Sequence, residues 1–393
     1  MTIEELYRDL HAHPELSFEE MRTAAIAAAE LRAAGFEVIE GIGITGVAGV
    51  LRNGDGPTVL LRADMDALPV LEDTGLAYAS TVTGVMHACG HDVHVACLIG
   101  AARELAATRA EWSGTVVAVF QPAEEVGGGA QAMLDDGLYE KVPVPDVVLG
   151  QHVGPAPAGT LGAHPGAAFA SADSIDITVR GRGGHGSRPE TTIDPIVIAA
   201  AVVGRLQSIV SREIAPQETS VVTVGRINAG TKNNIIPESA ELGLSMRAYS
   251  EEVRLRMIAA IKRIARAESA ASGAPEPIVE FAESFPVTVN DRVATERTMD
   301  AFRSVFGEEA VIDPGPVSGS EDVGLLATAV GVPLVYWILG GANTEAYLTA
   351  ANAGTIDRDI PSNHSSHFAP EIHPTLDRGV AALVTASREW LRS

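Results

Sequence analysis

Apolar segments with β-sheet character alternate with helical segments through the first part of the chain, and three of them run directly into acidic or histidine side chains. Alternating strands and helices predict a mostly parallel sheet covered by helices. In such a sheet, ligands bind beyond the carboxyl ends of the strands. We therefore expect one edge of the sheet to gather the polar ends of these segments, which are "RADMD" at 62–66, "QPAEE" at 121–125 and "GQHV" at 150–153.

The second part of the chain has a different pattern. A stretch rich in Gly, Pro and Ala at residues 152–170 is predicted to be a connector. Strand, helix, two strands, helix and strand then follow, which is the order of the ferredoxin-like split motif. The sequence therefore predicts an α/β fold. Residues 1–170 and 285–393 would form a domain with a mostly parallel sheet, and residues 171–284 an inserted ferredoxin-like α+β domain.

Composition and charge exclude several classes of function. The net charge is −23 and no cluster of Lys or Arg stands out, which argues against a nucleic-acid partner and against binding to an anionic membrane. The N-terminus lacks the basic start and apolar core of a secretory signal, and no apolar run approaches the ~18 residues of a membrane span. The chain has only two cysteines, too few for a disulfide framework, so we expect a cytoplasmic protein.

The segment "MHACGHDVH" at residues 86–94 concentrates side chains that are rare in the rest of the chain, which has only 11 His and 2 Cys. Such groups cost free energy to bury without a partner. Thiolate, imidazole and carboxylate together are the ligands of zinc and similar divalent ions, and two adjacent ions can share such a set. The candidate ligands near the predicted sheet edge are Asp64, Asp66, Cys89, His91, Glu124, Glu125, His152 and, near the C-terminus, His364.

The neighbouring acids of "PAEE" suggest a division of roles, in which one carboxylate binds metal and the other acts as general base. Two alternatives stay open from the residues alone. One is a cysteine hydrolase, because Gly90 and a helix that begins beside it could lower the pKa of the Cys89 thiol. The other is a non-catalytic binding protein that keeps the fold and the metals.

Motifs spread over nearly the whole chain resemble one known family. They include "RDLHAHPELSFEE", "LRADMDALPV", "MHACGHDVHVACLIGAA", "FQPAEEVGGGA", "GQHVGP", "GRGGHGSRPE", "NNIIPESAEL", "GSEDVG" and "NHSSHF". Together they resemble the dinuclear metal-dependent peptidases and aminoacylases, and most of all the amidohydrolase branch that holds hippurate hydrolase, N-acyl-amino-acid hydrolases and auxin-conjugate amidohydrolases.

The resemblance implies roles for individual residues of the first domain. Glu124 would be the general base, and Asp66 the carboxylate that orients a ligand. The last motif departs from the family pattern and leaves His364 and His367 as candidates, of which we choose His364. The implied metal ligands are Cys89, which would bridge two ions, and His91, Glu125, His152 and His364.

The resemblance also implies substrate contacts from the inserted domain. His185 would reach the site of a partner subunit and steady the oxyanion, while Asn234 and Arg247 would bind the backbone and carboxylate of the substrate. We therefore expect a homodimer or homotetramer that uses two divalent ions (Mn, Zn, Co or Ni). Its expected substrates are small N-acyl amino acids, with carboxypeptidase or dipeptidase activity of the same family as the alternative.

Overall fold

The computed structural model describes residues 1–391, which divide into two compact units. The first unit consists of Met1–Ala168, Val289–Pro316 and the chain from Asp322 onward. The second consists of Phe169–Thr288 and the short segment Val317–Glu321, which the sequence pattern assigned to the first domain.

The first unit is built on a mixed sheet of eight strands in the order β1-β2-β4-β3-β5-β16-β6-β15. Its four central strands, β4, β3, β5 and β16, all run parallel, whereas β1 and β2 pair antiparallel at one side. The prediction of an α/β fold with a mostly parallel sheet is therefore confirmed. The strands are β1 (Glu37–Ile42), β2 (Gly46–Asn53), β3 (Thr58–Asp64), β4 (Gly114–Gln121), β5 (Val147–Pro157), β6 (Leu161–Gly162), β15 (Val311–Ile312) and β16 (Leu334–Ala342).

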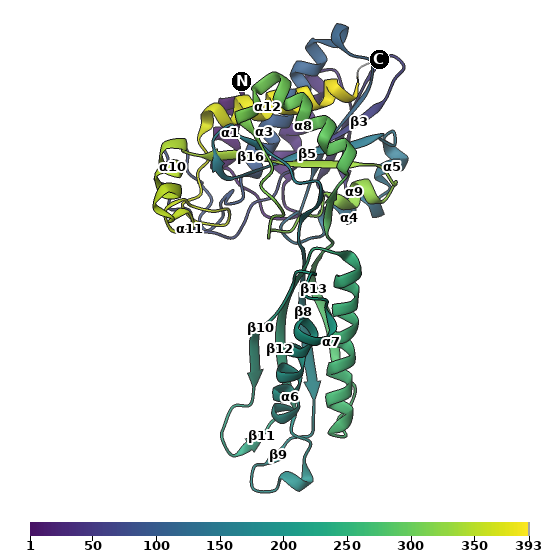
Figure 1. Cartoon of the computed structure of the whole chain (residues 1–393), viewed down its shortest axis with the longest axis vertical. Helices are drawn as coiled ribbons and strands as arrows, with labels where there is room; N and C mark the ends of the chain where they lie inside the picture. Colours follow the sequence, from purple (N-terminus) through teal and green to yellow (C-terminus); the bar gives the residue numbers. More distant parts are fainter. Residues whose placement is uncertain (392–393) are drawn as a thin grey trace. The chain divides into compact units, whose positions relative to one another are not determined.

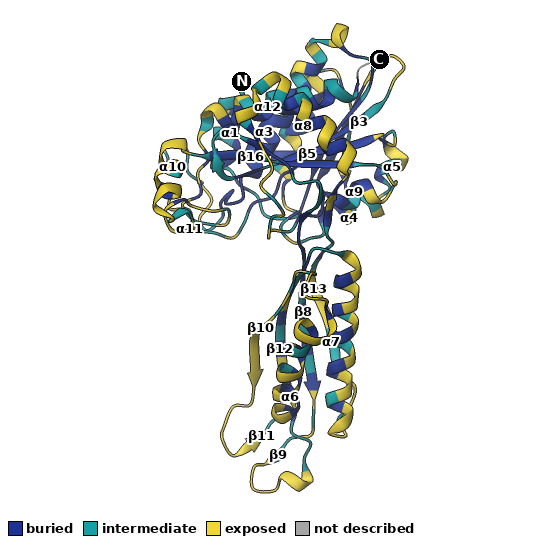
Figure 2. Cartoon of the chain, in the orientation of Figure 1, coloured by how far each residue is buried: buried dark blue, intermediate teal, exposed yellow. Residues whose placement is uncertain are grey.

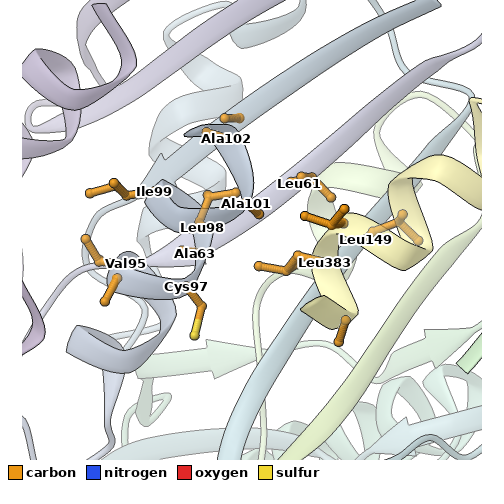
Figure 3. Packing of buried hydrophobic residues seen from close by; sticks show 14 of the residues in the cluster. Leu61, Ala63, Val95, Cys97, Leu98, Ile99, Ala101, Ala102, Leu149 and Leu383 are labelled. Carbon is orange, nitrogen blue, oxygen red and sulfur yellow. The ribbon is translucent and has the colours of Figure 1, made fainter. Parts of the chain in front are cut away.

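Helices cover the sheet of the first unit (Figure 1). On one face, α3 and α12 pack on the central strands, where Leu61 of β3 and Leu149 of β5 share a buried cluster with Leu98 and Leu383 (Figure 3). The helices are α1 (Ile3–Ala12), α2 (Met21–Ala33), α3 (His91–Ala107), α4 (Gly129–Asp135), α5 (Leu138–Lys141), α8 (Arg292–Phe306), α9 (Gly324–Thr328), α10 (Thr344–Ala353), α11 (Ile356–Asp359) and α12 (Ile372–Trp390).

The stretch predicted as a connector at residues 152–170 is largely sheet, so that prediction was wrong. Strand β5 continues to Pro157, β6 follows, and β7 (Gly166–Phe169) pairs with β14 (Thr288–Asn290). His152 consequently lies inside β5, opposite Ile338 of β16, and not at a strand end. Backbone pairing with β16 keeps this Gly- and Pro-rich segment extended, which composition alone does not reveal.

The second unit has the predicted ferredoxin-like topology. Its four-stranded antiparallel sheet has the order β10-β12-β8-β13, and the apolar side of this sheet packs with two helices into a core separate from that of the first unit. Figure 2 shows that the edge strand β10 is largely exposed. The elements are β8 (Ser171–Arg180), β9 (Gly184–His185), α6 (Pro195–Ser208), β10 (Ser220–Ala229), β11 (Ile235–Ile236), β12 (Ser239–Ala248), α7 (Glu251–Ala271) and β13 (Ile278–Phe285).

One segment of the second unit, Pro195–Glu213, is long and apolar enough by length and composition to pass for a membrane span. It is α6 with a short π-helical continuation at Ile209–Glu213. Its residues Ile198, Val202 and Leu206 belong to the core of the unit. Burial of one face in that core is what an amphipathic helix of a globular domain shows.

Candidate active site

The first unit brings the predicted ligands together in two groups that share one sulfur. Candidate ligand atoms of Cys89, His91 and His152 lie within 4.8 Å of one another, and so do those of Cys89, Glu125 and His364. A third group of the same size joins His91 to both acids of "PAEE". The four chain segments that supply these side chains are far apart in sequence and meet because β4 and β5 flank β3 beside the start of α3.

A glycine allows the start of α3 to come close to the rest of the site. Gly90 has the left-handed φ of 82°, and a Cβ there would lie 2.4 Å from Val153 Cγ1 and 3.2 Å from the Phe368 ring. The first distance would be an overlap and the second is tighter than most carbon contacts, so a glycine allows β5 and the loop that carries His364 to lie this close. The same residue ends the loop of Cys89 and starts the helix at His91.

A tight turn after β4 presents Glu124 and Glu125. Ala123 has a positive φ of 48°, an unusual backbone for a residue with a side chain, and its carbonyl accepts a hydrogen bond from Gly129 N at 3.0 Å. Glu20, which is fully buried, supports the turn, because its carboxylate accepts a hydrogen bond from Ala123 N at 2.8 Å. Glu124 is itself buried, while Glu125 is partly buried.

His364 lies on a loop without regular structure, residues 361–371, which we call the His364 loop. The adjacent Asn363 donates hydrogen bonds to Cys89 O at 3.1 Å and to Val153 O at 3.0 Å. The His364 imidazole lies 3.3 Å from a Glu125 carboxylate oxygen through Nε2. His367, the other candidate of the motif, turns away and contacts the Asp73 carbonyl at 2.6 Å.

Two buried atoms of the site face each other without a hydrogen-bond partner. His91 Nε2 and Glu125 Oε1 are 3.8 Å apart, and both are unsatisfied. A buried nitrogen or oxygen without a partner costs free energy. Both are good ligands for a divalent ion, so the donor set fits the metal that these residue types predict.

The site is electrostatically suited to cations. Burial and the Glu125 carboxylate raise the pKa of the Cys89 thiol, but His152 and His364 outweigh them and lower it to about 6. Contacts with Cys89 and Glu125 raise the pKa of His364 to about 10. Burial opposes charge on His91, yet Asp64 and Asp66 raise its pKa well above its usual range. Each of these two imidazoles therefore attracts a proton because anionic groups surround it, and a bound cation would take the place of those protons.

Asp66 has the surroundings of an orienting carboxylate. One of its oxygens lies 3.2 Å from His91 Nδ1, and the other accepts hydrogen bonds from Ser17 Oγ at 2.7 Å and Glu125 N at 3.0 Å. A ligand histidine is usually held in this way through its second nitrogen. Asp92, which follows His91 in the chain, contacts His11.

Asp64 and His94 are occupied elsewhere. His94 Nδ1 donates to one Asp64 oxygen, and His94 Nε2 accepts a hydrogen bond from Val153 N at 2.8 Å. The other Asp64 oxygen accepts from the buried Arg62 guanidinium at 2.6 Å. Neither ring nitrogen of His94 is left for a metal, and its bonds join α3 to β5 next to His152.

The three residues predicted in the inserted domain lie in the second unit, but not in one place. His185 pairs with Ile235 between β9 and β11, and the backbone carbonyl of Asn234 accepts a hydrogen bond from Gly186 N, so these two are neighbours. Arg247 lies near the other end of β12, opposite Ala172, and its guanidinium contacts the Ser318 carbonyl at 3.4 Å. At about 3.4 Å per residue, roughly 27 Å of strand separates the two ends.

Sequence reasoning missed two residues that shape the site. Glu20 and Asn363 hold the turn of "PAEE" and the His364 loop, respectively. Asn363 could have been suspected from its place in "NHSSHF", whereas the contact of Glu20 that supports the turn is with Ala123, 103 residues further along the chain.

Comparison with known proteins gives the family. The sequence profile of peptidase family M20/M25/M40 matches residues 60–362. A hippurate hydrolase from Campylobacter jejuni is 42% identical over 324 residues, which cover 82% of this chain and 84% of that protein. This chain belongs to peptidase family M20.

Other M20 relatives differ in what they are described to do. A thermostable carboxypeptidase from Saccharolobus solfataricus is 38% identical over 364 residues, or 91% of each chain. The crystal structure of a Bacillus subtilis protein, described as a dinuclear metal-binding peptidase of the M20 family, matches with a TM-score of 0.78 and 30% identity over 99% of this chain and 96% of that one. The predicted family and the predicted metal-dependent hydrolase are confirmed. The protein is an M20 amidohydrolase, and its relatives differ too much in their described substrates to identify its own.

Proposed function

We propose that this M20 enzyme cleaves the amide bond of N-acyl amino acids and releases a carboxylate and a free amino acid. The observation that carries the proposal is the pair of three-ligand groups that share Cys89, with Glu124 beside them. The relative described as a hippurate hydrolase supports this substrate class, because hippurate is an N-benzoyl amino acid. Acetyl, benzoyl and similar acyl groups all fall within the class.

The five predicted ligands would hold two divalent ions of the manganese, zinc, cobalt or nickel type. Cys89 would contact both ions, since it belongs to both groups. The ions, when bound, polarise the amide carbonyl and make water more acidic. Thiolate with imidazole and carboxylate suits all of these metals, so the ion in the cell depends on supply as well as on affinity.

Glu124 is the proposed general base. It takes a proton from the attacking water as the new C–O bond forms, and delivers that proton to the amide nitrogen as the C–N bond breaks, which leaves a carboxylate and a free amine. Burial of Glu124 limits the access of other water molecules to that proton. Asp66 keeps His91 in one orientation through both steps.

The proposed substrate contacts of the second unit require two copies of the chain. Within one copy, His185 and Arg247 lie near opposite ends of β12, too far apart to touch one small substrate. We therefore propose that Arg247 binds the substrate carboxylate at one active site, while His185 and Asn234 of a partner subunit serve the same substrate. A guanidinium can bind a carboxylate through two parallel hydrogen bonds, and a donor at the carbonyl oxygen stabilises the oxyanion.

A homodimer is the proposed assembly. Strand β10 is an edge of its sheet, and the side chains of Val221 and Ile227 on it are 49% and 53% exposed. An exposed edge strand with apolar side chains is a natural pairing surface. The proposed cytoplasmic location stays a prediction, and it agrees with two cysteines that are both free.

A substrate panel tests the proposed function. The purified enzyme is loaded separately with manganese, zinc, cobalt and nickel, and the release of free amino acid from N-acetyl and N-benzoyl amino acids is compared with that from unblocked dipeptides. The proposal predicts a higher kcat/KM for the N-acyl substrates with at least one metal, and a kcat lowered by about 10²–10⁴-fold in the Glu124→Gln variant. Preference for dipeptides would contradict it and favour the second candidate, a carboxypeptidase or dipeptidase, which the Saccharolobus relative supports.

A further inference from the structure

His11 is a buried cation between two acids. Its side chain is 1% exposed, with Nδ1 2.6 Å from an Asp92 oxygen and Nε2 3.2 Å from a Glu72 oxygen. A carboxylate oxygen accepts hydrogen bonds, so both ring nitrogens carry a proton and the imidazole is charged. The acids lie on different segments, since Asp92 follows the candidate ligand His91 at the start of α3 and Glu72 belongs to a loop.

That loop, residues 69–85, contains no helix or strand, and Glu72 is the residue that organises it. One Glu72 oxygen accepts a hydrogen bond from Ser80 N at 2.6 Å, while the other contacts Thr74 Oγ1 as well as His11. The Glu72 side chain is 5% exposed. A buried carboxylate that satisfies three separate donors ties the part of the loop between Thr74 and Ser80 to His11. Thr81 N holds the end of that part separately, by a hydrogen bond to Ala12 O at 2.9 Å.

The 69–85 loop is joined in turn to the His364 loop. Asp73 N donates to Ser366 O at 2.9 Å, and the Asp73 carbonyl contacts His367 Nδ1 at 2.6 Å. Both contacts use the backbone of Asp73, whose place is set by its neighbour Glu72. A continuous path of covalent and hydrogen bonds therefore leads from one candidate ligand to another, through His91, Asp92, His11, Glu72, Asp73, His367 and His364.

His364 depends on such support more than the other candidate ligands do. Its side chain is 57% exposed, whereas His91 is fully buried on a helix and His152 lies in a central strand. Its backbone also has a positive φ of 70°, which costs free energy and persists only when surrounding contacts enforce it. On the side of Cys89, His364 N donates to Ala88 O at 2.8 Å and Asn363 donates to Cys89 O. Further along the loop, Asp73 provides support through Ser366 and His367.

We propose that His11 and Glu72 are positioning residues for the His364 loop. They hold the 69–85 loop against it and thereby place His364 beside Glu125 and Cys89. The inference rests on the proposed metal site. His11 and Glu72 lie outside that site and would affect only the group of Cys89, Glu125 and His364. His367, which the proposed chemistry leaves without a role, becomes the contact that transmits this control.

Calorimetric titration with Mn²⁺ tests the proposal without relying on turnover. The metal-free wild type is expected to bind two ions, and His364→Ala identifies the ion that depends on the Cys89, Glu125 and His364 group. Glu72→Ala and His11→Ala are expected to lower the affinity for the same ion by about 10–100-fold, which is the effect of losing supporting contacts in other metal sites. The affinity of the other ion is expected to stay within about threefold, because His91 and His152 are held by a helix and a strand.

Two further variants separate positioning from general stability. His367→Ala alters a side chain that is 57% exposed, so it keeps the proposal testable if Glu72→Ala or His11→Ala does not fold. It should weaken binding of the same ion. In the double variant with Glu72→Ala, the loss of affinity should be smaller than the sum of the two separate losses, because both residues act through Asp73. His373→Ala is the matched control, because His373 also lies between two acids, but these are Glu4 and Asp377, which belong to neither loop. It should leave both ions unchanged.

The outcomes distinguish this inference from the proposed function. A wild type that binds fewer than two ions would overturn the metal site and the positioning role with it. A wild type that binds two, with folded Glu72→Ala and His367→Ala variants that bind both ions at wild-type affinity, would overturn the positioning role alone. Equal weakening of both ions would also overturn it, because the proposed control reaches only the His364 group.

Discussion

The sulfur of Cys89 lies 3.6 Å from Nε2 of His152 in the first unit. A thiol with a pKa of about 6 beside an imidazole has the chemistry of a nucleophilic pair. The surroundings favour a metal ligand instead, since Cys89 also belongs to the group of Glu125 and His364 and a nucleophile has no use for those residues. Family membership agrees with the metal ligand.

Removal of Cys89 should abolish binding of both ions, because its sulfur is the one atom common to both groups. Metal content after Cys89→Ala, measured by elemental analysis, is expected to fall from two ions to fewer than one per chain. Cys97→Ala is the matched control, since Cys97 is also a buried free thiol but belongs to the apolar core. Two retained ions in Cys89→Ala would remove cysteine from the ligand set.

Glu124→Gln should separate binding from chemistry. The amide keeps the size of the side chain but cannot accept the proton of water, and loss of a general base costs about 10²–10⁴-fold in kcat. Metal stoichiometry should stay at the wild-type value, because both ligand groups are complete without Glu124. Near-normal turnover by the metal-loaded variant would exclude Glu124 from the role.

Arg62→Met should destabilise the first unit strongly. The fully buried guanidinium lies 2.6 Å from Asp64 and 3.1 Å from Asp322, so its removal takes a buried cation away from two buried acids. Loss of one partner of a buried ion pair costs about 3–5 kcal/mol. Urea denaturation should reveal this loss, and Arg52→Met should change stability by less than about 1 kcal/mol, because its partner Glu37 is exposed. A change in Arg62→Met as small as the control's would show that the buried network contributes little.

His11 should make stability depend on pH in a defined direction. Burial opposes its charge, but Asp92 and Glu72 raise its pKa to about 10 from a usual value of 6.5. A raised pKa in the folded state adds stability that is complete below pH 6.5 and disappears as the pH rises through about 10. The pKa values of Asp92 and Glu72 are lowered, so the stability that these two acids contribute is lost only at acidic pH, where they become protonated.

The measurement is the difference in unfolding free energy between wild type and His11→Gln across this range. The difference should be largest near pH 6.5 and below, and it should shrink steadily toward pH 10. A difference that grows with pH, or does not vary, would show that His11 is not a cation in the folded protein.

Local sequence signals predicted some elements accurately. Helix α3 (His91–Ala107) begins directly after Gly90, where the sequence analysis expected a helix to start. The ferredoxin-like order of the second unit followed from strand alternation and two amphipathic helices, which are local patterns too. Ligand types at the ends of β3 and β4 also pointed to the site, because parallel strands bring their carboxyl ends to one edge.

Features that depend on distant partners escaped prediction. The extension of β5 depends on pairing with β16, which lies almost two hundred residues further along the chain. The contacts of the buried His11 are with Asp92 and Glu72, at separations of 81 and 61 residues. The sequence around His11 contains no signal that points to these partners. His367 was set aside as the alternative to His364, and only the structure reveals its contact with Asp73.

Anomalous X-ray diffraction from crystals of the fully manganese-loaded enzyme would locate the ions and the side chains that bind them. We predict two anomalous peaks in each chain, both in contact with Cys89 Sγ, one also bound by His91 and His152 and the other by Glu125 and His364. A single peak, or two peaks that do not share the sulfur of Cys89, would contradict it.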